Sequence, residues 1–465
     1  MFGPQRQRPP QQLPPGSWAW SLLAALLLVP CLTRSAFSGE AVEAKVKSVD
    51  LSTVLRTTVA SNPAIRAARA RWAAAQQKRA QSVALPDPSI EFDPFLRQMT
   101  EDDEKWRLSV KQMVPPPQRR RLAGQVSDDD ARLARLKLEM TVRNALSDAK
   151  ETFFELYYID RAEQITSEIR IVYERYGAMA VGGTGGVAQP SLPESFRVES
   201  QRAQLAYDLV QLAAMRRAEA GRLRSIMGVD RLANIGVTAS VRAPPVRLPA
   251  LEPLTRAALR YNQELASAGV EVEKSVHQVQ LARLAPVPEL MVGAQFMRTG
   301  GQDFPGGDPT KDPVMLMVGA SIPLWRQKYR AQVEEARQLE SAALADRESQ
   351  ALDVEANVIR AHFAMSTSLR LVRLYRDTLL GQSRAALRSA EELYRSDRVS
   401  LLALVETIST VHNFELAALR ATVDFYQNLA RLERITGRPI DLEAEAASAG
   451  DHNDDNPAHE EGSPK

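Results

Sequence analysis

Apolar residues recur along much of the chain at alternating steps of three and four, a spacing typical of a coiled-coil seam between α-helices. The first seam comprises Leu138, Val142, Ala145, Ala149, Thr152, Leu156 and Ile159. The second comprises Val354, Val358, Ala361, Met365, Ser368, Val372, Tyr375, Leu379, Gln382, Ala386, Ser389 and Leu393. The pattern predicts long helices over residues 118–177, 193–227, 324–396 and 399–437, the third of them roughly 100 Å long.

Four shorter stretches alternate between apolar and polar residues with a period of two, which is typical of β-strands. They form two predicted β-hairpins, residues 88–114 and 288–322, in which one face is apolar and the other charged or less apolar. A soluble antiparallel sheet would show the same alternation. In lipid, however, four strands cannot close a barrel and open sheet edges are not tolerated, so several chains would be needed. Three copies would supply twelve strands.

Prolines mark each predicted passage between helix and strand. They stand at Pro86 and Pro88, at 115–117, at Pro286 and Pro288, and at Pro323. Proline interrupts both helices and central strands. Its presence at all four junctions supports the predicted changes between α-helix and β-strand.

Residues 51–228 and 254–437 contain the same features in the same order, which indicates an internal duplication. Asn62 is matched by Asn262, and the segment ending at Gly228 is matched by the segment ending at Gly437. We expect two repeats, residues 45–228 and 254–437, joined by a linker at 229–253. The fold class is therefore mainly α, with duplicated long helical hairpins and two inserted β-hairpins.

The two ends of the chain differ from the repeats. Residues 1–38 combine basic residues, a short apolar run and small residues, as in a secretory signal peptide. Cys31, the sole cysteine, lies there, and a lipidated Cys31 remains an alternative that the preceding Pro30 disfavours. No later segment is apolar for long enough to predict a membrane-spanning helix. The acidic tail, residues 441–465, lacks periodicity and is predicted to be disordered.

Composition and motifs argue against an enzyme and against a nucleic-acid partner. Lys and Arg total 59 and Asp and Glu total 57, without a basic stripe. The five histidines lack metal-ligand spacing, and no catalytic signature or cofactor motif occurs. His412 falls in register with the apolar positions of its predicted helix, so we interpret it as a packed interface residue.

Short motifs in this order resemble the TolC-type outer-membrane efflux proteins over residues 45–440. The motifs are Leu85-Pro86-Asp87-Pro88, Gln112-Met113-Val114-Pro115 and the segment from Tyr394 to Leu402. The resemblance implies a homotrimer with a β-barrel of twelve strands in the lipid of a Gram-negative outer membrane and an α-helical barrel extending into the periplasm. It also implies a periplasmic adaptor protein and an inner-membrane pump, which we expect to be of the RND type.

In this family the two helical turns form the periplasmic tip, which carries the gate and the adaptor contact. The correspondence covers residues 173–195 and 394–402, and the expected tip residues are Tyr176, Gly177, Tyr394, Asp397, Val399, Ser400 and Leu401. Family members often have glycine where Asp397 stands, and the first turn carries an additional Gly-rich stretch, residues 181–189. Asp397, with Glu391 and Glu392, could form acidic rings around a three-fold axis that favour cations; a solvated helix end is the equal alternative.

The strands supply further candidates. Trp106 and Trp325 are expected at the membrane interface, and Arg97, Arg107 and Lys111 would line the barrel interior, paired with Glu91 and Asp93. Met291, Met297, Met315 and Met317 fall on the less apolar strand faces, where thioethers could bind soft metal ions. Simple packing by flexible side chains is the preferred interpretation. The predicted function is passive efflux of metal ions or small toxic compounds, with type I protein secretion or a periplasmic coiled-coil scaffold as alternatives.

Overall fold

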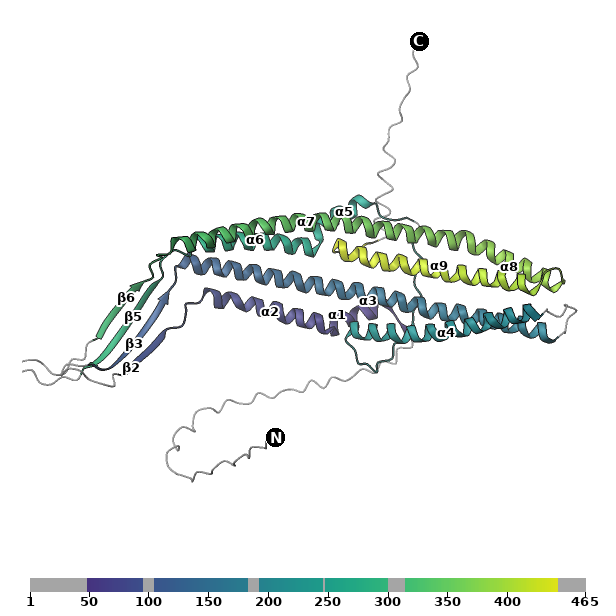
Figure 1. The fold of residues 1–465 in the computed structure, drawn as a ribbon, viewed down its shortest axis with the longest axis horizontal. Helices are drawn as coiled ribbons and strands as arrows, with labels where there is room; N and C mark the ends of the chain where they lie inside the picture. The colour runs from purple at the N-terminus through teal and green to yellow at the C-terminus, as the bar shows by residue number, and fades with distance from the viewer. Residues whose placement is uncertain (1–47, 95–103, 183–191, 246, 300–313, 442–465) are drawn as a thin grey trace, which may run out of the picture. The chain divides into compact units, whose positions relative to one another are not determined.

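The computed structural model describes residues 48–94, 104–182, 192–245, 247–299 and 314–441. Its described part consists of long helices and a four-stranded antiparallel sheet, as the sequence predicts (Figure 1). The α-helices are α1 (Leu51–Ser61), α2 (Pro63–Val83), α3 (Pro117–Gly182), α4 (Leu192–Met227), α5 (Leu251–Tyr261), α6 (Gln263–Arg283), α7 (Arg326–Arg373), α8 (Leu380–Arg395) and α9 (Leu401–Thr436). The strands are β1 (Ser48–Val49), β2 (Ser89–Pro94), β3 (Glu104–Val114), β4 (Val237–Thr238), β5 (Leu290–Thr299) and β6 (Val314–Ala320).

The larger sheet has the strand order β2-β3-β5-β6, with every pair antiparallel. Strand β2 follows α2, β3 leads into α3, β5 follows α6 and β6 precedes α7. The helices pack in the same order, since α3 contacts α2 and α6, and α6 contacts α7. One edge of this arrangement is therefore formed by α2 and β2, and the other by α7 and β6.

The duplication recurs as a matched pair of helix breaks. The side-chain Nδ2 of Asn62 donates to Ile226 O at 2.7 Å, while its Oδ1 accepts from the first turn of α2. Asn262 likewise donates to Ile435 O at 2.9 Å and caps α6. Each asparagine thus ends one helix, begins the next and holds the end of a long helix against the break.

A glycine completes each break. Gly228 and Gly437 have φ angles of 66° and 75°, in the left-handed region that favours glycine. A Cβ at Gly437 would lie 2.1 Å from Tyr261 O, and one at Gly228 would lie 2.5 Å from Ser61 O. Both positions therefore require glycine for conformation and for space.

The predicted seam of α3 is buried from Ala145 onward, whereas Leu138 and Val142 are half-buried. Ala149, Leu156 and Ile159 are almost inaccessible, and Phe153 and Phe154 extend the same core toward Leu223 of α4 and Val423 of α9. A second core joins α5, α7 and α9, with Val354, Val358 and Met365 as members. The α3 seam is thus confirmed from Ala145 to Ile159, and the second seam is confirmed from Val354 to Val372 except for the half-buried Ala361.

Two polar networks link the helices. Arg420 of α9 donates to both carboxylate oxygens of Glu155 on α3 at 2.9 Å. Buried Asp160 accepts from Arg216 of α4 at 2.7 Å and from the Thr238 backbone at 2.8 Å. The second network holds β4, within the predicted linker 229–253, against the helices.

The chain is helical without a gap from Arg326 to Arg395, close to the predicted range 324–396, but it is not one regular α-helix. A π-helix, Leu374–Leu379, separates α7 from α8. A π-turn accommodates one extra residue, so the apolar seam moves by one position beyond it. Leu380, Ser383 and Tyr394 are buried, whereas the predicted seam residues Gln382, Ala386 and Ser389 are exposed.

Several predictions lie outside the described residues. They concern the signal peptide with Cys31, most of the tail 441–465, Arg97, and the greater part of the Gly-rich stretch 181–189. Among the helices that the structure describes, none is both long and apolar enough to cross a membrane.

Candidate functional site

The turn between α8 and α9 packs against the adjoining ends of α3 and α4. A buried apolar cluster, here called the tip cluster, joins them and consists of Tyr173, Tyr176, Val198, Leu205, Tyr394, Leu401, Leu404, Val405 and Ile408. The two helical hairpins, distant in sequence, are thus held together where they turn.

Two tyrosines of α3 connect the hairpins by hydrogen bonds. The Tyr173 hydroxyl lies 3.1 Å from Val405 O and 2.7 Å from the Ser409 hydroxyl. The Tyr176 hydroxyl donates to Glu391 Oε1 at 3.1 Å, and its ring meets Tyr394 edge-on with centroids 6.0 Å apart. Burial raises the pKa of Tyr176, and the neighbouring Glu391 carboxylate raises it further, so the phenol remains protonated and able to donate.

The turn itself is closed by backbone geometry around Asp397. This residue has a φ of 57°, the one positive φ of a non-glycine residue among the described residues. The amides of Asp397 and Arg398 donate to Tyr394 O and Leu393 O, at 3.1 and 2.9 Å. Ser400 then caps α9 by accepting from the Ala403 amide at 3.3 Å. Aspartate tolerates the left-handed region better than most residues, which explains how it can occupy this turn.

The expected tip residues therefore fall into two groups. Tyr176, Tyr394 and Leu401 lie within the tip cluster, while Asp397 and Ser400 are exposed on the turn. Val399 is half-buried, and Gly177 belongs to the last part of α3.

The sequence analysis placed Tyr173 in the tip range but did not single it out as a contact residue. It also missed Val405 and Ile408 as members of the cluster. Their heptad spacing with Leu401 is the signal that could have identified them.

The four-stranded sheet has one exposed apolar face. Leu316 and Val318 are 85% and 80% exposed, and Ile90, Phe92 and Val292 lie on the same face. Trp106 stacks obliquely between Phe92 and Phe296, and Trp325 is 76% exposed just beyond β6. A single described chain thus exposes an apolar surface that monomeric soluble proteins rarely leave uncovered.

The opposite face of the sheet, here called the polar face, carries an ion pair and methionines. Glu91 pairs with Lys111, as expected, and Asp93 lies opposite Arg107 in the strand register. On the same face, Ser109 and Gln295 are 2% and 7% exposed. The two faces therefore differ in polarity as the alternation predicts.

All four predicted methionines lie on the polar face, together with Met113, which the sequence analysis overlooked. Met113 and Met291 are directly opposite each other on β3 and β5, and Met317 of β6 is opposite Gly293. Cross-strand partners have Cβ atoms about 5 Å apart. Gly319 leaves room for the Met291 methyl group, since a Cβ there would lie 2.9 Å from Met291 Cε.

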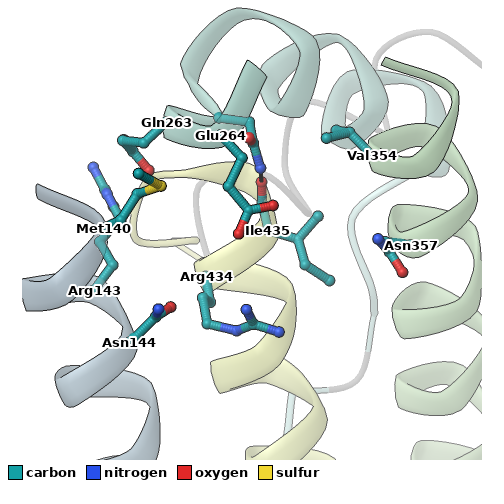
Figure 2. Close-up of a pocket in the computed structure, with 10 residues that line it drawn as sticks. Met140, Arg143, Asn144, Gln263, Glu264, Val354, Asn357, Arg434 and Ile435 are labelled. Carbon is teal, nitrogen blue, oxygen red and sulfur yellow. Dashed lines mark hydrogen bonds between the residues drawn. The ribbon is translucent and has the colours of Figure 1, made fainter. Parts of the chain in front are cut away.

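A small polar cavity lies beside the Asn262 helix break. Figure 2 shows Arg143 of α3, Glu264 of α6 and Arg434 of α9 around it, and its volume is about 90 Å³. Burial lowers the pKa of Arg143, although Glu139 opposes this effect. A cavity of this size accommodates a few water molecules. We assign it a structural role at the break.

Comparison with known proteins identifies the fold. Residues 254–438 match the family model described as "Outer membrane efflux protein". No curated protein matches the chain.

Three solved channels illustrate the structural similarity. The outer-membrane channel OprN is 20% identical, covers 83% of this chain and 89% of its own, and has a TM-score of 0.67. The CmeC outer membrane channel of Campylobacter jejuni is 13% identical, the match covers 86% of this chain and 88% of CmeC, and the TM-score is 0.69. The MtrE outer membrane channel of Neisseria gonorrhoeae, in its open state, is 15% identical, the match covers 84% of this chain and 89% of MtrE, and the TM-score is 0.69.

The structural matches extend over both repeats, whereas the family model covers the predicted second repeat. Taken together, residues 254–438 match the family of outer membrane efflux proteins, and the chain as a whole shares the fold of solved outer-membrane channels.

Proposed function

We propose that three copies of this chain close a passive efflux channel in the outer membrane, with four strands from each copy completing a twelve-stranded barrel. The resemblance to outer membrane efflux proteins implies a trimer. The observation that carries the proposal is that both edges of the described chain, α2 with β2 and α7 with β6, are unpartnered. Since β2 and β6 run in opposite directions, β6 of one copy can pair antiparallel with β2 of the next.

Helix α7 carries a second seam that supports this assembly. Its members are Ala342, Ala345, Ser349, Leu352, Ala356, Ile359 and Phe363, at alternating steps of three and four, and all are exposed in the single chain. Helix α2 exposes Ala67, Ala70 and Ala74 at the same spacing. Small residues allow two helices to approach closely, so α7 of one copy pairs with α2 of the next as a coiled coil.

Replacing Ile359 by Asp tests this arrangement, because it would bury a carboxylate in the proposed seam. We expect the trimer in detergent to dissociate, as measured by native mass spectrometry. Leu344→Asp is the matched control: Leu344 is about as exposed as Ile359 but lies on another side of α7. Trimers that survive Ile359→Asp would contradict the proposed seam.

For the cargo we propose soft metal cations such as Cu(I) or Ag(I). The support is the group Met113, Met291 and Met317 on the polar face, which would line the lumen of the barrel. Thioethers prefer soft cations. Among the described residues no group of three or more His, Cys, Asp or Glu side chains is suited to hold a metal ion.

Deletion of the gene, with complementation, tests the cargo. We expect increased susceptibility to copper and silver, restored by the native chain and restored less well by Met291→Leu/Met317→Leu. Met215→Leu on α4 is the control. Unchanged metal susceptibility, together with loss of a secreted protein, would instead favour type I secretion.

We also propose two protein partners. A periplasmic adaptor protein binds the helical turns around the tip cluster, and an RND-type pump lies beyond the adaptor.

A further inference from the structure

A large open cavity lies where the sheet passes into α7. Its volume is about 950 Å³. Pro286, Ile322, Leu324 and Val333 give it an apolar part, and the side chains of Arg326, Arg330 and Arg337 give it a basic part. The cavity thus combines the two properties required to bind an anionic amphiphile.

The basic part is not neutralised within the described chain. Arg337 pairs with Glu334 at 3.5 Å, but the side chains of Arg326 and Arg330 have no ion-pair or hydrogen-bond partner among the described residues. The sequence after Pro323 contains no acidic residue until Glu334. The excess of positive charge at this end of α7 is therefore available to an external anion.

The first repeat has the same charge pattern at its corresponding junction. Arg119, Arg120 and Arg121 follow the prolines at 115–117, and the first acidic residue after these prolines is Asp128. Arg119 pairs with Glu289, while Arg120 Nε is buried without a hydrogen-bond partner. Three copies would repeat both basic segments around the channel.

The cavity lies away from the proposed seam between copies. Arg326, Arg330 and Arg337 are spaced by four and seven residues, so they share one side of α7. That side continues to His362, which contacts the Pro249 carbonyl at 3.1 Å, within the segment leading to α5. The seam containing Leu352 and Ile359 follows another line of the helix. Neighbouring copies would therefore leave the cavity open.

We infer that this cavity binds the headgroup of an anionic phospholipid from the periplasmic leaflet of the outer membrane. The inference rests on the proposed placement of the sheet in the membrane. Ile322 and Leu324 continue the alternation of Leu316 and Val318, so the cavity adjoins the apolar face of the sheet. Guanidinium groups bind phosphate in a bidentate manner, and basic pockets at membrane interfaces bind anionic headgroups. The apolar lining accommodates the first part of an acyl chain.

Native mass spectrometry of the purified full-length protein tests this inference. The protein is exchanged into lipid mixtures of phosphatidylethanolamine with or without phosphatidylglycerol, and the retained lipids are measured. We expect the native protein to prefer phosphatidylglycerol. Loss of one interfacial arginine should lower this preference about 5-fold, so Arg326→Gln/Arg330→Gln should lower it about 30-fold. Arg347→Gln, an exposed arginine farther along α7, should leave it unchanged.

The Arg326→Lys/Arg330→Lys variant is the control for a folding defect. It retains the positive charge, so it should keep part of the preference for phosphatidylglycerol. Undiminished phosphatidylglycerol binding by the glutamine variant would overturn the inference. Dissociation of the oligomer by that variant, with lipid retention intact, would also overturn it and identify the face as a contact between copies. A trimer that conducts ions without headgroup preference would contradict this inference alone. A protein recovered without membrane would contradict the proposed function.

Discussion

Gly437 stands at the point where the end of α9 meets the break between α5 and α6. Its φ of 75° costs roughly 1–2 kcal/mol for a residue with a Cβ. An alanine Cβ would also lie 2.1 Å from Tyr261 O and 2.7 Å from Tyr261 C. These are backbone atoms, so relief requires movement of the break itself, at about 1–3 kcal/mol. Together, Gly437→Ala should lower the free energy of unfolding by about 2–5 kcal/mol.

Thermal unfolding of the purified protein in detergent, followed by the loss of helical circular dichroism, measures the effect. Gly381→Ala is the control, because a Cβ at Gly381 meets no atom within 4 Å. Within a helix that change should be neutral or stabilise by up to about 1 kcal/mol. Gly228→Ala, at the equivalent position of the first repeat, should be destabilising like Gly437→Ala. If Gly437→Ala and Gly381→Ala melt at the same temperature, the proposed role of the break is incorrect.

Three further changes test other parts of the structure. Asp397→Asn should alter single-channel conductance and cation preference, because it removes the exposed carboxylate from the α8–α9 turn; an unchanged current would eliminate the acidic ring. Burial lowers the pKa of His412, with Glu415 and Asp208 opposing it, so protonation favours the unfolded chain and stability should fall as the pH drops below about 6.5. His412→Leu should remove that part of the pH dependence, as measured by melting temperature against pH. Tyr176→Phe removes the hydrogen bond to Glu391 and should speed amide hydrogen exchange in residues 394–402, with a loss of about 1 kcal/mol.

The sequence was sufficient for most elements, for the α3 seam from Ala145 onward and for the second seam up to Val372. Period-two alternation located β3 and β5, and steps of three and four located the buried positions of α3. These patterns report directly which side of an element is covered. The faces of the sheet followed from the same reasoning, which is why the predicted methionines share one face.

The parts that could not be predicted depend on local backbone conformation or on distant contacts. A π-turn has no simple residue signature, so the shift of the seam to Leu380 and Ser383 was not visible in the sequence. Asn62 and Asn262 were recognised as a repeated feature. Their hydrogen bonds to Ile226 and Ile435 join residues more than 160 positions apart, and no sequence pattern encodes such a contact.

The site was only partly predictable for the same reason. Tyr176 and Tyr394 were expected at the tip from family resemblance, but their ring contact requires the two hairpins to be adjacent. Met113 was missed because it stands beside the proline exit, where the alternation of β3 ends. The open seam of α7 was obscured by its small residues.

Native mass and channel activity, measured on the same preparation, test the central claim most directly. Protein extracted from the outer membrane in detergent should have three times the mass of the mature chain, and in a planar bilayer it should produce discrete conductance steps. A monomer of the same chain that needs no detergent and gives no conductance would contradict the account.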